Sequence, residues 1–356
     1  MQQVQVQKSE LTNAKLVERE AGPLADGAVR LAIESFSVTA NNVTYAVVGD
    51  GFGYWNFFPA PEGEGIVPMW GHARVAESNN PDFAVGERVY GYLPMASHLD
   101  VVPGKVSPSG FMDIAEHRQP MSPIYNQYSR LANDPEHDPD REGERMIFGP
   151  LFKTGFLIEY FMRSENWFGA AQVILTSASS KTALGLASVC KHRSPQVRRI
   201  GLTSAGNVKF VEDSGLYDQV LSYDDVDQLP ITDSVTVDFA GNSDLLRSIH
   251  EKMGDALKYS CLVGVTHVDE RGGGTAGIPG PNPTMFFAPD HAVALFKSVG
   301  PEEAGKQMAS SWRNFLADAG GNIEIERFQG LGKAREVFLE MIGGKVDPAK
   351  GIVIEP

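Results

Sequence analysis

The chain has 356 residues, of which 42% are hydrophobic and 21% charged, shares typical of a globular protein with more than one domain. No apolar run approaches the roughly 18 residues that span a bilayer, and the N-terminus lacks the apolar block of a secretion signal, so we expect a soluble cytoplasmic protein with no membrane partner. The net charge of -14 disfavours a nucleic-acid partner, because contacts to phosphates require clustered Lys and Arg.

Short apolar or alternating segments, separated by Gly and Pro, characterise the first third of the chain. They lie at 28–33, 71–77, 88–93 and 99–101, and this pattern predicts a β-rich domain. Residues 103–150 are rich in Pro and charged residues and contain no long periodic segment. That composition predicts a functional or connecting segment rather than folded core.

From Met146 onward, strand-like apolar segments alternate with helix-like ones, which predicts an α/β domain with a doubly wound parallel sheet at 146–309. The later segments are expected to return to the first domain, which would then comprise 1–130 and about 310–356. Helices are predicted at 154–163, 182–192, 207–214, 301–316 and 333–342, and strands at 173–176, 199–203, 219–221, 235–239, 260–265, 323–327 and 351–354.

The segment 172–187 is the most informative, because an apolar run breaks into small hydroxylated residues and then resumes with helical spacing. It predicts a strand, a tight turn and a helix N-terminus, where unpaired N–H groups and the helix dipole favour a phosphate. The ends of successive parallel strands meet at one edge of such a sheet and should hold the same ligand. The candidates are Ser177, Ser179, Ser180, Lys181, Thr182, Thr203, Ser204, Asn207, Lys209, Ala240, Gly241, Gly264, Val265, Thr266, Phe286 and Phe287.

The end of the second strand bears on the choice of cofactor. An NAD-binding enzyme would carry an acid there to bind the ribose hydroxyls, but 203–209 contains none. This segment instead offers the hydroxyls of Thr203 and Ser204, the Asn207 amide and Lys209. None of these groups repels a 2'-phosphate, so the segment predicts NADP as the cofactor. Phe286 and Phe287 follow a Gly- and Pro-rich loop, so they are expected either to cover the nicotinamide or to form an edge strand.

Two segments, 70–75 and 83–91, resemble the Gly-His-Glu and Gly-Asp-Arg-Val-Tyr-Gly segments of medium-chain dehydrogenase/reductases, in their zinc-free quinone oxidoreductase-like branch. Segments 41–46, 125–128 and 159–161 resemble a poorly characterised subgroup of that superfamily, labelled domain of unknown function 2855. The resemblance implies a GroES-like β-rich catalytic domain, completed by the C-terminal residues, and a Rossmann domain. It also implies that Thr154 borders the cofactor and that a homodimer is possible.

This sequence departs from the family pattern in two places. Serines and Lys181 replace the glycines of the phosphate-binding turn, so hydroxyls and an ammonium group must compensate for lost backbone freedom. His72 stands at a zinc-ligand position, but Ala73 replaces the acid that follows it in the family. One imidazole cannot hold zinc, so no metal is expected, and His72 is interpreted as a packing or hydrogen-bonding residue.

Without zinc, a reductase must polarise the substrate carbonyl with hydrogen bonds. The resemblance puts Tyr45, Asn41 and Asn42 in the substrate cleft as catalytic candidates. The second choices are Tyr125, Asn126 and Tyr128. A phenol can donate a proton to the enolate. Equally, the two asparagines can form a turn and Tyr45 can pack in the interior.

The sequence thus predicts a zinc-independent, NADP-dependent oxidoreductase that reduces an activated carbonyl, an enone or a quinone-like small molecule. Two alternatives remain open. One is a catalytically silent member that binds a small molecule or a partner through the same cleft, as the lost glycines suggest. The other is a non-redox lyase or isomerase that holds the cofactor.

Overall fold

The chain divides into two compact units, which the computed structural model describes over residues 1–263, 277–319, 323–344 and 347–356. The first unit comprises Met1–Ile147 and Glu324–Pro356, and the second comprises Phe148–Ile323. Helix α8 (Pro301–Ala319), expected in part to complete the first domain, lies in the second unit. None of the helices in these described ranges has the length and apolar character needed to cross a membrane.

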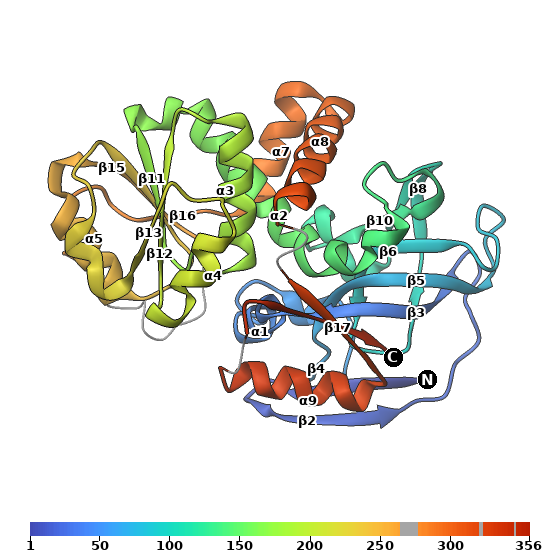
Figure 1. Ribbon diagram of the computed structural model, residues 1–356. Coiled ribbons are helices and arrows are strands. Elements are labelled where there is room, and N and C mark those ends of the chain that lie inside the picture. The colour runs from blue at the N-terminus through green and yellow to red at the C-terminus, as the bar shows by residue number, and fades with distance from the viewer. Residues whose placement is uncertain (264–276, 320–322, 345–346) are drawn as a thin grey trace. The chain divides into compact units, whose positions relative to one another are not determined.

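Two sheets form the first unit (Figure 1). Every strand pair in them is antiparallel except that of the two C-terminal strands. The smaller sheet contains, in order, β2 (Glu10–Glu18), β1 (Gln2–Gln7) and β4 (Glu64–Gly65). The larger contains, in order, β17 (Glu324–Gln329), β18 (Lys350–Glu355), β3 (Val29–Val38), β5 (Pro68–Ser78), β6 (Arg88–Pro94), β10 (Gln127–Arg130), β9 (Gly110–Asp113) and β8 (Pro103–Ser107), with β7 (His98–Val101) paired to β3.

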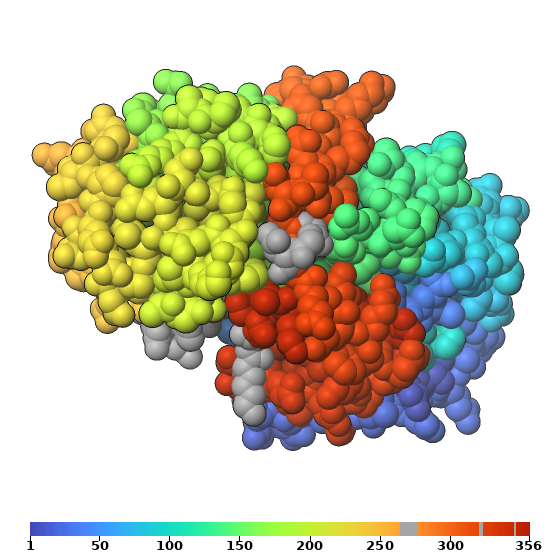
Figure 2. All heavy atoms as spheres, in the orientation of Figure 1, coloured from blue at the N-terminus to red at the C-terminus, as the bar shows by residue number. Residues whose placement is uncertain are grey.

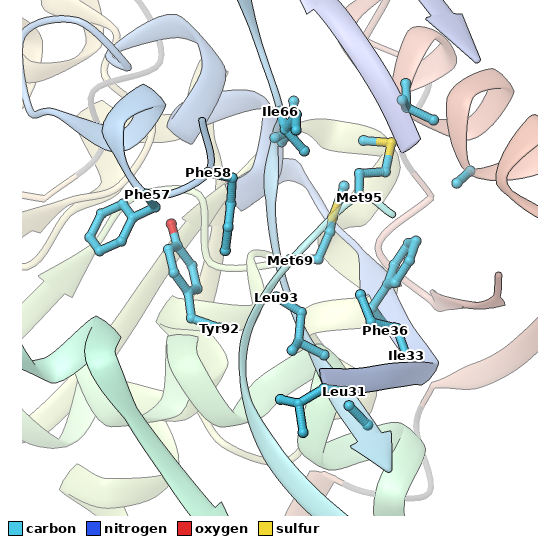
Figure 3. Close-up of a cluster of buried hydrophobic side chains, with 14 of the residues drawn as sticks. Leu31, Ile33, Phe36, Phe57, Phe58, Ile66, Met69, Tyr92, Leu93 and Met95 are labelled. Carbon is cyan, nitrogen blue, oxygen red and sulfur yellow. The ribbon is translucent and has the colours of Figure 1, made fainter. Parts of the chain in front are cut away.

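The core of the first unit lies between these sheets, helix α1 (Ala40–Val47) and helix α9 (Leu331–Ile342). Figure 3 shows part of it, with the ring of Tyr92 between those of Phe57 and Phe58. The expectation that 103–150 lies outside the core is wrong, because β8, β9 and β10 belong to the larger sheet and Phe111 and Tyr128 are buried. These strands are only four or five residues long, too short to produce a periodic pattern in the sequence.

Helix α2 (Glu142–Ser164) is longer than the predicted helix at 154–163 and contains Pro150. A proline has no backbone N–H, so the carbonyl four residues earlier, that of Met146, loses its helical donor. The Ser37 hydroxyl of β3 donates to this carbonyl at 2.8 Å. Thr154, a cofactor candidate, donates its hydroxyl to the Pro150 carbonyl of the same helix at 3.3 Å.

The second unit contains one parallel sheet with the order β13-β12-β11-β14-β15-β16, the strand order of dinucleotide-binding folds. Helices α3 and α4 lie on one side of this sheet and α5 on the other (Figure 1). The strands are β11 (Gln172–Leu175), β12 (Arg198–Thr203), β13 (Gln219–Ser222), β14 (Ser234–Asp238), β15 (Leu257–Leu262) and β16 (Thr284–Met285). The helices, besides α2 and α8, are α3 (Lys181–Arg193), α4 (Val208–Asp213), α5 (Ser243–Met253) and α7 (Ala288–Val299).

Two glycines allow α2 and α3 to cross closely in the second unit. A Cβ at Gly155 would lie 2.6 Å from the Leu186 nitrogen, and one at Gly185 would lie 3.1 Å from the Phe152 Cα. Both contacts are to backbone atoms, which cannot rotate away. We therefore expect Gly155→Ala to lower the free energy of unfolding by about 2–3 kcal/mol, measured by urea denaturation.

Gly305 provides the matched control, since it lies inside α8 with no atom within 4 Å of its would-be Cβ. Gly305→Ala should raise the free energy of unfolding by about 0.5–1 kcal/mol through helix propensity alone. Equal effects of the two substitutions would show that the crossing of α2 and α3 tolerates a methyl group.

Candidate functional site

The turn after β11 has the geometry of an anion-binding helix start. Ser177 adopts a left-handed conformation with φ 48°, and its carbonyl accepts the Ser180 N–H at 2.7 Å. Ser180 then caps α3, accepting the Ala183 N–H on its hydroxyl at 3.3 Å. Within the described residues, the N–H groups of Ser179 and Thr182 donate to no backbone carbonyl. Two donors at the positive end of a helix are therefore available to an anion.

The serine-rich turn is tied to the end of the neighbouring strand β12. The Ser179 hydroxyl is bonded by the Thr203 hydroxyl at 3.3 Å and by the Asn207 amide at 3.2 Å. Ser204, between these two partners, is exposed. The structure thus brings together four of the predicted residues at the edge where a 2'-phosphate would lie, with no carboxylate among them.

Lys209 points into solvent from the first turn of α4, and the segment that carries it forms part of the exposed surface (Figure 2). Its ammonium group contacts Asp213, one turn further along the helix, at 2.8 Å and 3.0 Å. Hydrogen bonding to that carboxylate raises the pKa of Lys209. Exposed pairs of this kind contribute little to stability, so the ammonium group can exchange partners readily.

The strongest contacts of the site join Thr176 and Asp238, at the ends of the central strands β11 and β14. The Thr176 hydroxyl donates to the Asp238 carboxylate at 2.6 Å and accepts the Phe239 and Ala240 N–H groups at 2.9 Å and 3.1 Å. The carboxylate also accepts the N–H groups of Ala240 and Gly241 at 3.2–3.3 Å. These strands flank the topological switch point, where dinucleotides bind, and the buried Asp238 carboxyl group there is bound by several donors.

Ala240 and Gly241 were predicted to approach the cofactor, and their N–H groups instead bind within the protein. Phe286 also has an internal role: it is buried, its N–H donates to the Leu262 carbonyl at 2.8 Å and its ring stacks on His291 at 4.1 Å. Phe287 is 38% exposed. The remaining candidates, Gly264, Val265 and Thr266, lie outside the described residues.

Tyr223 is a residue of this site that the sequence analysis missed. It follows β13 and begins a short 3-10 helix, Tyr223–Gln228. Burial raises the pKa of Tyr223, while hydrogen bonding from the side chain and backbone of Ser177 lowers it, so the phenol lies beside the turn. An aromatic residue after the third strand is the only signal in the sequence, and taken alone it indicates core packing equally well.

In the first unit, Tyr45 is buried with its hydroxyl engaged. The Trp70 indole donates to this hydroxyl at 3.1 Å. Burial raises the pKa of Tyr45 above its ordinary value. Hydrogen bonding with Trp70, Asn41 and Tyr92 lowers the pKa by a smaller amount, so the net effect is a rise. The phenol thus stays protonated, but at 4% exposure it lies below the surface.

Tyr125 pairs with Tyr54, a residue that is not among the predicted catalytic candidates. Their hydroxyl oxygens are 3.0 Å apart and partly buried. Burial raises the pKa of both phenols, so both are protonated at neutral pH. One hydroxyl of the pair donates to the other, so the proton of the accepting hydroxyl is available to an outside acceptor. The hydrogen bond within the pair polarises that second O–H group.

Two other catalytic candidates have structural contacts instead. The Tyr128 hydroxyl donates to the Tyr92 carbonyl at 2.6 Å and accepts from Arg118 at 2.9 Å, in the interior. Asn42 is buried in the first turn of α1, where its amide oxygen accepts the Thr39 N–H at 2.6 Å and its amide nitrogen donates to the Pro68 carbonyl at 2.8 Å. Both polar ends of this amide are thus used within the fold. Asn41, its neighbour, is partly buried.

The tyrosines lie over one face of the larger sheet, where paired residues form two rows. The Trp70 row consists of Ser37, Trp70 and Tyr92, and the His72 row consists of Ser35, His72 and Tyr90. Tyr125 packs on the first row, with its ring centre 4.9 Å from that of Tyr92. Across the described parts of the chain, no three His, Cys, Asp or Glu side chains lie close enough together to hold a metal ion.

His72 is completely buried, and its imidazole is held in the neutral form. Burial lowers the pKa of His72 to about 3, and the nearby Glu142 carboxylate only partly opposes this. The unfolded chain takes up a proton on this imidazole near pH 6.5, whereas the folded protein does so only near pH 3. Stability is therefore complete above pH 6.5 and falls between these values, by up to about 1.4 kcal/mol per pH unit from this group.

We expect His72→Gln to flatten the acid side of the stability curve over this pH range. The measurement is urea unfolding of both proteins at a series of pH values between 4 and 7. The free energy of unfolding of the variant should fall less steeply with decreasing pH than that of the wild type. Parallel curves would mean that the buried imidazole is protonated in the folded state as well.

A model of the family described as "Protein of unknown function (DUF2855)" matches residues 36–347 of this chain. A comparison with curated proteins found no match. Among solved structures, CurA from Vibrio vulnificus in complex with NADPH is 12% identical with a TM-score of 0.62, over 100% of this chain and 99% of that one. A quinone oxidoreductase from Pseudomonas syringae pv. Tomato DC3000 is 14% identical, with a TM-score of 0.60 and the same coverage.

The yhdH oxidoreductase from Salmonella enterica, in complex with NADP, is 13% identical with a TM-score of 0.55, and all of both chains is covered. Similarity at these identities extends over the whole length and shows a shared fold. The first unit corresponds to a GroES-like domain and the second to a Rossmann domain, so the predicted fold class is confirmed.

Proposed function

We propose that this chain, which belongs to the DUF2855 family and is a member of a poorly characterised subgroup of medium-chain dehydrogenase/reductases, is a zinc-independent NADPH-dependent reductase. Its substrate is a small molecule with an activated carbonyl, an enone or a quinone-like ring. The observation that carries the proposal is the coincidence, at one sheet edge, of the dinucleotide strand order with a helix start that keeps N–H donors available.

The donor set of the second unit fits NADP. The N–H groups of Ser179 and Thr182 and the dipole of α3 suit the diphosphate, and Ser204, Asn207 and Lys209 suit the 2'-phosphate. The Asp238 carboxylate is bonded within the protein by Thr176 and two backbone N–H groups, which direct it away from the donors that suit the diphosphate. When bound, NADPH supplies a hydride to an electron-poor carbon of the substrate.

The Tyr54–Tyr125 pair is the proposed proton donor. The hydroxyl proton that is not used inside the pair can form a hydrogen bond to the substrate carbonyl oxygen. As that oxygen gains electron density, the proton transfers to it. The hydrogen bond between the two tyrosines stabilises the phenolate that remains. This role differs from the expectation for Tyr45, whose hydroxyl is more deeply buried and binds Trp70. Zinc would otherwise polarise the carbonyl, and here the phenols take over that role.

Titration of the purified chain with NADPH, followed by nicotinamide fluorescence, tests the proposal. We expect saturable binding that is at least 10-fold tighter than for NADH, and NADPH oxidation when a panel of enones and quinones is added. Binding without oxidation would favour the lyase or isomerase alternative. The absence of saturable binding would exclude the reductase and leave the catalytically silent protein.

A further inference from the structure

Four polar atoms are buried without a hydrogen-bond partner on two side chains of the first unit. They are both ring nitrogens of His72 and the Nε and Nη1 atoms of Arg145. His72 is 0% and Arg145 is 3% exposed. A buried donor left without an acceptor destabilises the folded state, so most native proteins avoid such groups outside functional sites.

The two side chains adjoin one ring. The guanidinium carbon of Arg145 lies 4.2 Å from the centre of the Tyr90 ring, and the centre of the His72 ring lies 5.1 Å from it. The Tyr90 hydroxyl donates to the Arg145 carbonyl at 3.4 Å, which fixes the ring against the start of α2. The Nη2 atom of Arg145 binds Asp134, so an ion pair positions the guanidinium group while its other N–H groups remain unused.

The charges around His72 suit an anionic group. Burial is the main cause of the lowered pKa of His72; among the neighbouring charges Glu142 raises it, whereas Arg145, Arg88 and His137 lower it. Glu142 is already compensated, because it accepts bonds from Arg88 at 2.7 Å and 3.0 Å and from His137 at 2.9 Å. A carboxylate is the acceptor that matches a guanidinium group best, and a neutral imidazole can donate one further bond to it.

The position of these groups relates them to the proposed proton donor. His72 lies two residues after Trp70 on β5, so the two rows are about 7 Å apart. Tyr125 packs on the Trp70 row, and Trp70 is partly exposed. One extended ligand could therefore contact both rows.

We propose that Arg145 and His72 bind the carboxylate of the substrate, so that the preferred substrate is a conjugated carbonyl compound with a carboxylate about 7 Å from the reacting oxygen. The catalytic part of this inference rests on the proposed reductase function. The binding of a carboxylate between Arg145 and His72 does not, and it can be measured on the chain without cofactor.

Benzoate and its neutral analogue benzamide are the probes for the binding step. Titration of the full chain is followed by Trp fluorescence and by NMR of protein labelled at histidine. We expect benzoate to bind saturably and shift the imidazole signals of His72, and benzamide to bind at least 10-fold more weakly. Equal binding of the two probes, or no shift at His72 on binding, would overturn the assignment.

Arg145→Lys keeps the charge but removes the Nε donor, and it should weaken benzoate binding at least 10-fold. Arg141→Gln is the matched control, since Arg141 precedes α2 on the surface and pairs with Glu144, and it should leave benzoate binding unchanged. If Arg145→Lys prevents folding, His72→Gln keeps the Asp134 ion pair and should weaken binding likewise. Wild-type affinity in a folded Arg145→Lys or His72→Gln variant would refute the proposal.

Turnover separates this inference from the proposed function. With NADPH, the KM for 4-formylbenzoate, whose para carboxylate matches the proposed separation from the aldehyde oxygen, should be at least 10-fold lower than for its methyl ester, and Arg145→Lys should raise only the KM for the acid. If NADPH is not oxidised but benzoate binding depends on Arg145, the reductase proposal fails and the carboxylate site stands. If acid and ester are reduced equally well, the reductase stands and the carboxylate preference is wrong.

Discussion

Replacing the hydroxyls of the Tyr54–Tyr125 pair should lower turnover by up to about 100-fold, the lower range for general acid catalysis, with little change in NADPH affinity. The hydroxyl that faces the substrate carries the proton, and the other one polarises it. The turnover of Tyr54→Phe and Tyr125→Phe should therefore differ. One substitution removes the hydroxyl that donates the proton to the substrate, and the other only weakens that donation. Steady-state kinetics with an enone substrate, together with NADPH titration, measures both effects.

The double variant Tyr54→Phe/Tyr125→Phe provides an internal control. Because the two hydroxyls act as one unit, its turnover should be close to that of the more damaging single variant, rather than the product of both losses. Tyr45→Phe should reduce turnover less than either, since the Tyr45 hydroxyl accepts a bond from Trp70 and is buried. If both single variants keep turnover within threefold of the wild type, the pair is not the donor.

Thr176→Val should lower the free energy of unfolding by about 2–4 kcal/mol and weaken NADPH binding at least 10-fold. The substitution keeps the shape of the side chain but removes the hydroxyl that bonds Asp238 and the N–H groups of Phe239 and Ala240. The carboxylate then loses the bond from the Thr176 hydroxyl, at the point where the diphosphate would lie. Urea unfolding and NADPH titration measure the two effects.

Thr176→Ser is the conservative control, because it keeps the hydroxyl and loses only a buried methyl group, at a cost of about 1 kcal/mol. It should retain NADPH affinity near that of the wild type. Should the valine and serine variants unfold with free energies within 0.5 kcal/mol of each other, the hydroxyl would have no special role at the strand ends. A weakened affinity in both variants would point to packing instead.

The Rossmann part of the fold could be predicted because its strands are buried on both faces. Such strands are continuous apolar runs, as at residues 173–175 of β11, and the alternation with helices then predicts a parallel sheet. The turn at Ser177 was equally visible, since hydroxylated residues interrupt an apolar pattern. The strands of 103–130 were not, because Pro and Gly break them into pieces too short for any periodicity.

The candidate site was less predictable, because its contacts join residues far apart in the chain. Tyr54 and Tyr125 are separated by 71 positions, and neither neighbourhood indicates that the hydroxyls meet. Asn42 has the side chain of a substrate-binding amide, but its oxygen caps helix α1 and its nitrogen binds the Pro68 carbonyl of β5. Thr176 and Asp238 were visible as strand ends, yet only the parallel pairing of β11 with β14 makes them partners.

The proline in α2 also restricts the residue at position 37, more than a hundred positions away in the chain. A side chain at position 37 that has no hydrogen-bond donor would leave the buried Met146 carbonyl without a partner. A larger side chain with a donor would not fit, because this position is only 2% exposed. Positions 37 and 150 are therefore thermodynamically coupled, because serine is needed at position 37 only when proline occupies position 150. Relatives in which residue 150 carries an N–H are free to place alanine or valine in this part of β3.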